Sequence, residues 1–406
     1  MNQMADDHSV FDEIVAFNSD RDPDLVERKL TRLSESAFTF FRGTDHLFGK
    51  AWPALKPNDS GPAILCCGDL HADNFGAYQT EEGEFRFDIN DFDEALFAPC
   101  SFDLVRCTAS LLLAGEEWHL SPLQTNGIAL AFLDQYRAAV TESLRTGVIG
   151  EIAPGSGAGP VWKLLNATAS GTQAALLEQT TERGKNGTRR ITPNPDKYPK
   201  VSDKRADKVR EAIEAFGVSI GHAKAYRVLD VSGRIAGVGG LGLRRYAVLI
   251  DGGAAGHNRL LDVKEARPSC VLPGVDTPQV EHFPSEAQRI VSAQRRLQAK
   301  PLRGLAALEF GGRAYRLREM IPEESRSNLK HLQDQPGELR QALEVVGQIT
   351  GWSHLRGARP EQRPMLARWA EGAGMAAVLA AAVRFADQTL QDFTAYQTAF
   401  RAQKKR

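Results

Sequence analysis

A run of acidic and polar side chains follows the apolar residues 63–65 and covers residues 67–93, with the sequence CGDLHADNFGAYQTEEGEFRFDINDFD. Asp69 opens this run, Asn74 follows, and Asp91 comes after a stretch that alternates like a strand. Mg²⁺ prefers oxygen ligands and usually binds together with phosphate. The spacing therefore predicts a site in which Asp69 orients or deprotonates a nucleophile while Asn74 and Asp91 hold Mg²⁺, as in phosphoryl transfer of the kinase type.

A simpler interpretation exists for any one of these acids. Asp69 alone could cap a turn, and Asp88, Asp91 and Asp93 could form a solvated loop. Carboxylates gathered at the ends of short strands repel one another and add nothing to a core, however. The whole set at this spacing therefore favours a site.

A second informative stretch covers residues 225–266, where Gly237, Gly239, Gly240 and Gly242 give the pattern G-x-G-x-x-G. A dinucleotide-binding version opens into a helix, but the residues that follow here, YAVLI, are strand formers. A strand, a glycine loop, a strand and a further strand with an inward lysine cover the phosphates in a kinase small lobe. In that arrangement the glycines let the backbone approach the phosphates and Lys264 holds the α- and β-phosphates. The alternative is a glycine-rich hairpin with an exposed lysine.

The residues after this lysine predict a helix over 285–299, with Ser285 as its N-cap. A kinase-type lysine pairs with an acid on the helix that follows it. Glu286 is the single acid in this helix, and Gln294 is an alternative partner deeper within it.

A hairpin is expected next, with strands over residues 305–310 and 313–320 around two glycines. In the kinase interpretation its end is the hinge whose backbone meets adenine. Arg318, Glu319 and Met320, followed by residues 321–322, would form that hinge.

The rest of the chain is mostly helical in pattern. A helix is predicted to begin at Ser101 as N-cap, and Asp103 could either cap it or brace the backbone of the Asp69 loop. Residues 155–204 read as loops with little regular structure. The other predicted helices cover residues 24–33, 122–144, 337–350, 352–359 and 365–400, the last interrupted near 372–374.

The order of the parts is reversed relative to ordinary kinases, in which the glycine loop and lysine come first. A circularly permuted chain explains this order, because chain ends commonly lie close together on a surface. The expected fold is an α+β, protein-kinase-like fold of two lobes, with a mainly antiparallel sheet in the small lobe. Residues 1–220 would begin the large lobe, 221–322 would form the small lobe, and 323–406 would complete the large lobe.

The composition and charge of the chain argue against several classes of function and location. The 406 residues have a net charge of −1, so no basic field suggests nucleic acid. The N-terminus lacks the apolar core of a signal peptide, and the most apolar late run is too short for a membrane span. Five cysteines without a metal-binding pattern indicate reduced thiols. These features predict a cytoplasmic protein with neither nucleic-acid nor membrane partners.

The segments CGDLHADNFG, FDINDFDEA, GVGGLGLRRY and LLDVKEA together resemble the bacterial family known as domain of unknown function 2252. The likeness covers most of the chain. That family is similar to kinases, and to aminoglycoside phosphotransferases around the Gly-Asp-x-His-x-x-Asn motif. The resemblance implies ATP and Mg²⁺ as ligands, Asp69 as the catalytic residue, Asn74 and Asp91 as metal ligands, and Lys264 as the nucleotide lysine.

The leading hypothesis is therefore an ATP- and Mg²⁺-dependent phosphotransferase whose acceptor is a small molecule or a protein. A pseudokinase that acts as a scaffold and a nucleotidyltransferase with the nucleotide bound in reverse are alternatives that use the same residues. A metal-dependent phosphohydrolase is disfavoured, because the further histidine motifs that such an enzyme needs are missing.

Overall fold

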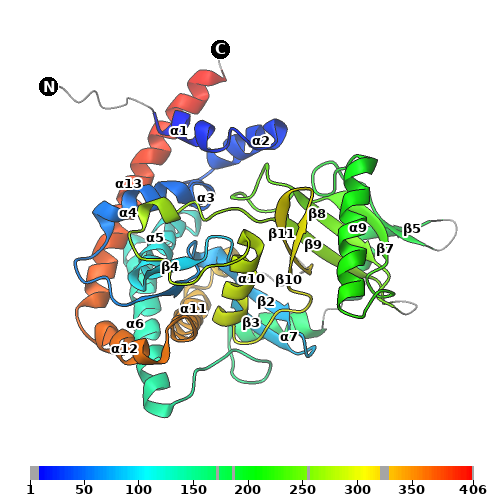
Figure 1. The fold of residues 1–406 in the computed structure, drawn as a ribbon. Coiled ribbons are helices and arrows are strands. Elements are labelled where there is room, and N and C mark those ends of the chain that lie inside the picture. Colours follow the sequence, from blue (N-terminus) through cyan, green and yellow to red (C-terminus); the bar gives the residue numbers. More distant parts are fainter. Residues whose placement is uncertain (1–8, 171–172, 185–187, 254–256, 321–328, 405–406) are drawn as a thin grey trace.

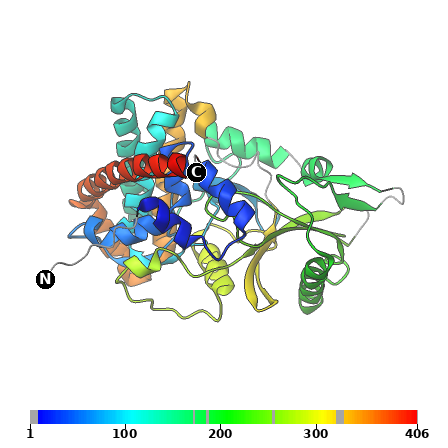
Figure 2. The same cartoon turned by 90° about the horizontal axis from the view of Figure 1, so that it is seen from above.

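The computed structural model describes residues 9–170, 173–184, 188–253, 257–320 and 329–404. Within these ranges the chain forms 13 α-helices and 11 strands, so it is a mixed α+β protein, as predicted. Figure 1 shows most of the helices gathered on one side and the largest sheet on the other, and Figure 2 shows the same separation from above.

The larger helical part is built from both ends of the chain. Its members are α1 (Val10–Phe17), α2 (Pro23–Leu33), α3 (Ala37–Gly43), α4 (Asp45–Leu55), α5 (Ser101–Glu117), α6 (Pro122–Thr146), α11 (Pro336–Gly357), α12 (Arg363–Glu371) and α13 (Gly374–Gln403). Helix α6 packs along α11, while α13 packs against α5 and α1. Apolar side chains such as Phe48, Trp52 and Phe102 are fully buried between these helices.

The described residues also form three small antiparallel sheets of two strands each, two beside the helical part and the last in the chain beside the largest sheet. They pair β1 (Ala63–Cys66) with β4 (Leu96–Pro99), β2 (Phe75–Gln79) with β3 (Phe85–Ile89), and β5 (Thr181–Arg183) with β6 (Arg189–Ile191). Asp69 follows β1, Asn74 precedes β2 and Asp91 follows β3, so these short strands place the acidic loops.

The largest sheet is antiparallel, with the strand order β10-β11-β9-β8-β7. Its strands are β7 (Val228–Gly233), β8 (Arg245–Ile250), β9 (Arg259–Glu265), β10 (Ala306–Phe310) and β11 (Arg313–Glu319). One face packs on α9 (Asp203–Ser219) through alternate residues such as Tyr246 and Val263. Because successive side chains of a strand point to opposite faces, Arg245, Asp262 and Lys264 lie on the other face.

Two further elements flank this sheet. Helix α10 (Glu286–Leu297) follows β9 in the chain and packs on β10 and β11. Its N-cap is Ser285, whose hydroxyl accepts a hydrogen bond from the Gln288 amide, as predicted. Helix α8 (Gln173–Thr180) lies on the side away from α9, where its Leu176 and Leu177 are buried against the sheet. The helix before it, α7 (Pro160–Ser170), packs instead on α11, β2 and β3.

Several sequence predictions need correction. Residues 155–204 contain α7, α8, β5 and β6 rather than mainly loops, because apolar residues such as Val161, Leu165 and Leu176 are buried against other parts of the fold. Ser101 is the first residue of α5 rather than its N-cap, which is Cys100. Helix α11 runs unbroken through the junction predicted near residue 351, and the predicted interruption at 372–374 is confirmed.

The structure also bears on two predictions made from the composition. All five cysteines are free thiols, as predicted. In the described part of the chain no single helix has the length and apolar character needed to cross a membrane, although the bent pair Pro360–Glu371 and Gly374–Gln403 meets both criteria jointly.

Candidate active site

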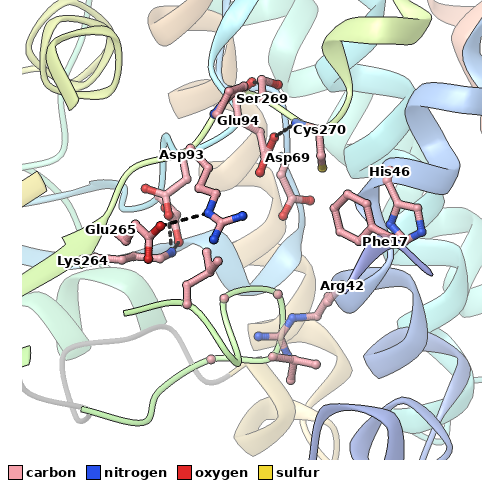
Figure 3. A pocket seen from close by; sticks show the side chains of 18 of the residues that line it. Phe17, Arg42, His46, Asp69, Asp93, Glu94, Lys264, Glu265, Ser269 and Cys270 are labelled. Carbon is pink, nitrogen blue, oxygen red and sulfur yellow. Dashed lines mark hydrogen bonds and ion pairs between the residues drawn. The ribbon is translucent and has the colours of Figure 1, made fainter. Parts of the chain in front are cut away.

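A cavity of about 910 Å³ lies where the helical part, the acidic loops and the large sheet meet. It is lined by Asp69, Asn74 and Asp91 on one side and by Gly240 and Lys264 on the other. Figure 3 shows Asp69 between the Phe17–His46 pair on one wall and Lys264 with Asp93 on the opposite wall. The structure therefore brings together two groups of predicted residues that are far apart in the sequence.

The loop that carries Asp69 is held by Asp103 at the start of α5. The two carboxylate oxygens of Asp103 accept hydrogen bonds from the amides of Cys67 (2.7 Å) and Gly68 (2.9 Å). His354 Nε2 lies 3.3 Å from the same carboxylate. The prediction that Asp103 braces this loop is confirmed.

Gly68 is required at this turn. Its φ of 92° lies in the left-handed region, and a Cβ atom there would lie 2.0 Å from the carbonyl oxygen of Glu94. The glycine thus lets the Asp69 loop press against the loop after β3, which brings the two acidic loops into contact.

Asp69 is oriented by a buried arginine that the sequence reasoning did not assign. Arg106 donates from Nε (3.0 Å) and Nη2 (2.8 Å) to one oxygen of Asp69, and its Nε also lies 2.9 Å from Asp45. The Arg106 side chain is fully buried, with its guanidinium over the Phe41 ring. Burial opposes its charge, but Asp45 and Asp69 raise the pKa of Arg106 above its usual value. The sequence could have indicated this contact, because Arg106 follows Asp103 by three residues on the predicted helix and residues at this spacing lie on the same helix face.

His71 lies beside the second oxygen of Asp69, at 3.9 Å from Nε2. Its Nδ1 accepts a hydrogen bond from the Asp73 amide, which assigns the proton of a neutral ring to Nε2. Burial lowers the pKa of His71 to about 4, so the ring is neutral near pH 7. His71 therefore presents an N–H group toward Asp69.

Asn74 connects the two acidic loops. Its Nδ2 donates to the Asp69 carbonyl at 2.7 Å, and its own carbonyl accepts from the Asn90 amide at 2.8 Å. With Nδ2 engaged in this way, Oδ1 is the atom with which Asn74 could ligate a cation.

Asp91 and Asp93 face Lys264. The lysine forms an ion pair with Asp93, and its Nζ lies 3.8 Å from Asp91. Burial would raise the pKa of Asp91, but Lys264, Arg316 and nearby arginines lower it below its usual value. One oxygen of each aspartate is buried without a hydrogen-bond partner among the described residues.

The lysine's predicted partner on α10 is wrong. Glu286 instead pairs with Arg289 one turn along the same helix, at 2.6 Å. The alternative, Gln294, is buried and donates to Gln298. Asp93, two residues after the predicted metal ligand, is the acid that the fold brings to Lys264.

This correction gives a testable difference between two acids. Replacing Glu286 by Gln should lower the free energy of unfolding by less than about 1 kcal/mol, because it removes one partly exposed pair on a helix surface. Replacing Asp93 by Asn should cost about 1–3 kcal/mol, because Lys264 is largely buried and loses its ion-pair partner. Urea denaturation of both variants measures the two losses. Equal losses would show that Glu286 has a larger role than the geometry assigns.

The glycine loop joins β7 to β8 and covers the lysine. Gly237, Gly239 and Gly240 line the cavity, while Gly242 makes a turn with φ of 87° at its edge. A Cβ atom on Gly240 would lie 3.2 Å from Lys264 Cε. The loop is also tied to the N-terminal segment, since the Gly239 carbonyl accepts from Arg21 (2.7 Å) and Lys29 (3.1 Å).

Of the described residues of the predicted hinge, Arg318 lines the cavity, whereas Glu319 and Met320 do not. Glu319 ends β11 with Arg259 and Arg303 each 3.9 Å from its carboxylate, and burial raises its pKa. Met320 is buried in an apolar cluster on the sheet. Residues 321–322, the rest of that hinge, lie outside the described residues.

Arg42 lines the cavity and pairs with Asp73 at 2.6 Å. Among the described residues, two groups of side chains have metal-ligating atoms close together, Cys66–Asp103–His354 and Asp45–Glu94–Cys270. Hydrogen bonds and ion pairs within the protein account for the first group, since Asp103 already accepts from two amides.

The fold and site define a class of α+β protein in which a carboxylate-rich helical part faces a glycine loop and lysine across one polar cavity. The family model described as "Uncharacterized protein conserved in bacteria (DUF2252)" matches residues 21–399, and the chain belongs to this family. No curated protein and no solved structure matches the chain.

Proposed function

We propose that this protein is an ATP- and Mg²⁺-dependent phosphotransferase, a group-transfer enzyme that acts at a phosphorus atom of the nucleotide. The observation that carries the proposal is the shared cavity. Asp69, Asn74 and Asp91 lie in it opposite the glycine loop and Lys264. Each of these groups has a defined task in kinase-type transfer, and neither group alone would suffice.

The large sheet supports a permuted kinase-like fold. A glycine loop joins its first two strands, Lys264 lies on the third, and α10 precedes the last two. Kinases place the glycine loop, the lysine and the following helix in this sequence. Both ends of the chain pack in the helical part, as expected if the ends of an unpermuted chain have been joined elsewhere.

The side chains in the cavity fit a magnesium ion. Mg²⁺ takes oxygen ligands, commonly one or two carboxylates together with phosphate. Asp91 and Asp93 each have a buried oxygen without a hydrogen-bond partner among the described residues, and Asn74 has an oxygen available nearby. Asp91 and Asn74 would hold the ion, which supplies neutralisation of the charge on the phosphates. Lys264 would move from Asp93 to a phosphate oxygen.

Asp69 would orient the acceptor hydroxyl. Arg106 fixes one of its oxygens and leaves the other, beside His71, on the cavity side. Asp103 acts through the backbone and is a positioning residue.

The cavity is lined by eight carboxylates and seven Lys or Arg side chains, so it is not simply acidic. A cationic acceptor is therefore no better suited to it than a zwitterionic one.

The test is thermal unfolding of the full chain with ATP, with and without Mg²⁺. A ligand that binds the folded state at 100 times its Kd stabilises it by about 2.7 kcal/mol, so Mg²⁺ with ATP should raise the Tm by several degrees. Asp91→Asn should weaken Mg²⁺-dependent ATP binding by at least about tenfold, because it removes the charged metal ligand.

Asp134→Asn is the matched control. It removes an aspartate from an exposed pair on α6, outside the cavity lining, and should respond to ATP as the unchanged chain does. If millimolar ATP with Mg²⁺ leaves the Tm of the unchanged chain where it was, the nucleotide site does not exist and the proposed function fails.

A further inference from the structure

The face of the large sheet that lines the cavity has charged side chains at the position where a nucleobase would need an apolar surface. Asp262 lies two residues before Lys264 on β9 and is fully buried. Arg245 binds it through two hydrogen bonds of 2.7 Å, and Arg234 lies 2.7 Å from it. Arg316 and Arg318 of β11 lie at 3.4 and 3.5 Å. One carboxylate is thus shared by four guanidinium groups.

We call Arg234, Arg245, Arg316 and Arg318 the arginine cluster. It has more positive charge than its single shared aspartate, Asp262, can balance. Nε of Arg318, and Nε and Nη1 of Arg316, are buried without a hydrogen-bond partner among the described residues. Arg245 and Arg318 are over nine-tenths buried, and both line the cavity. Burial and the neighbouring Arg316 lower the pKa of Arg318 to about 9, as expected for a crowded cation.

The apolar part of the same sheet face is already covered. Leu249, Leu260 and Met320 are buried against Leu176 and Leu177 of α8, and none of these five residues lines the cavity. A purine ring needs an apolar slot of this kind. The chain fills the slot with its own leucines, which leaves the charged part of the face as the part open to a ligand.

Rings suitable for a base lie at the other end of the cavity. The described lining residues with aromatic or imidazole rings are Phe17, His46, His71 and Phe75, all from the helical part and its loops. Phe17 and His46 stack with centroids 3.9 Å apart and planes at 6°, and both face the cavity in Figure 3. Burial lowers the pKa of His46 to about 3, so its ring is uncharged.

We propose that Arg245 and Arg318 bind the terminal phosphates of ATP, with the base toward Phe17 and His46, so that the α-phosphate is the group transferred. Guanidinium forks match phosphate oxygens in charge and geometry. The inference rests on the proposed nucleotide site and specifies the direction in which the nucleotide enters it.

The reaction in this orientation is nucleotidyl transfer. The acceptor oxygen forms a bond to the α-phosphorus, and the bond from the α-phosphorus to the bridging oxygen of the β-phosphate breaks. Pyrophosphate leaves with that electron pair, and the hydroxyl proton passes to the Asp69 carboxylate. The products are the acceptor carrying AMP and pyrophosphate held by the arginine cluster.

In the first experiment, isothermal titration calorimetry measures the affinity of the full chain for tripolyphosphate in the presence of Mg²⁺. Arg245→Gln and Arg318→Gln should each weaken tripolyphosphate binding by at least tenfold. Arg86→Gln is the matched control, since Arg86 is equally buried, pairs with Glu84 and Glu151, and lies outside the cavity lining. Equal affinities in all four proteins, or no binding by the unchanged chain, would overturn the anion site.

The second experiment needs no variant and so does not depend on how the arginine variants fold. The unchanged chain is irradiated with 8-azido-ATP and Mg²⁺, and the labelled peptides are identified by mass spectrometry. Label within residues 13–53 supports the reversed orientation, and label on β8, β9 or α8 overturns it. Absence of Mg²⁺-dependent ATP binding overturns the proposed function instead, while the tripolyphosphate titration still decides whether the anion site exists.

Discussion

Replacing Arg106 by Ala should lower the free energy of unfolding by about 3–5 kcal/mol, the cost of leaving buried carboxylates without their counter-ion. Arg106 is fully buried and contacts both Asp45 and Asp69. Burial raises the pKa of Asp45 despite the attraction of Arg106. Without the arginine, Asp45 has lost its cation, and Asp69 has lost the contact that sets its direction.

The same variant should lose group transfer. Asp69 would no longer point one oxygen into the cavity, and misplacing a reacting group by about 1 Å can cost on the order of 100-fold in rate. Urea denaturation followed by circular dichroism gives the stability loss. Arg137→Ala, which breaks an exposed pair on α6, is the control and should cost less than about 1 kcal/mol. Similar losses in the two variants would mean that the buried network contributes little.

The motifs of the candidate site were visible in the sequence because each of them lies within a short stretch of the chain. Asp69 and Asn74 are separated by one short turn, and Asp91 follows a five-residue strand. The glycine loop was identified by the strand formers on its far side. For Asp103 the sequence left two roles open, a helix cap and a brace, and the structure shows the brace. A side chain at the start of a helix can reach the backbone of a preceding loop.

The partner of Lys264 could not be predicted in the same way. Glu286 was chosen because the kinase pattern places an acid on the next helix, but Asp93 reaches the lysine across the cavity from another part of the fold. That contact depends on how the acidic loops dock on the sheet. Spacing along the chain contains no information about it.

Residues 155–204 were misjudged for a different reason. Their composition is polar and glycine-rich, which is typical of loops. Two short helices form there because Leu165 and Leu177 are buried on neighbouring parts of the fold. Tertiary packing, rather than local propensity, stabilises such short helices, so a sequence pattern alone gives little sign of them.

Replacing Asp262 by Asn should cost about 3–5 kcal/mol, because the four arginines would lose the one carboxylate that they share. The strand pattern Leu-Leu-Asp-Val-Lys gave no hint of this cluster, because its arginines come from three other places in the chain: Arg234, Arg245 and the strand β11. Asp251→Asn is the control. It breaks a pair with the exposed Arg227 and should cost less than about 1 kcal/mol.

The pH dependence of this loss distinguishes a charge effect from a packing effect. Burial would raise the pKa of Asp262, but Arg234 and Arg245 lower it well below the usual value of 3.8. A carboxyl with a lowered folded-state pKa stabilises the fold fully above its unfolded-state pKa, and that stabilisation is lost as the pH falls through the folded-state value. The difference between the unchanged chain and Asp262→Asn should therefore stay constant near neutral pH and shrink below about pH 4. Urea denaturation at a series of pH values measures it. A difference that persisted unchanged through the acid range would show that Asp262 acts through shape and hydrogen bonding, and the arginine cluster would then need no anion to balance it.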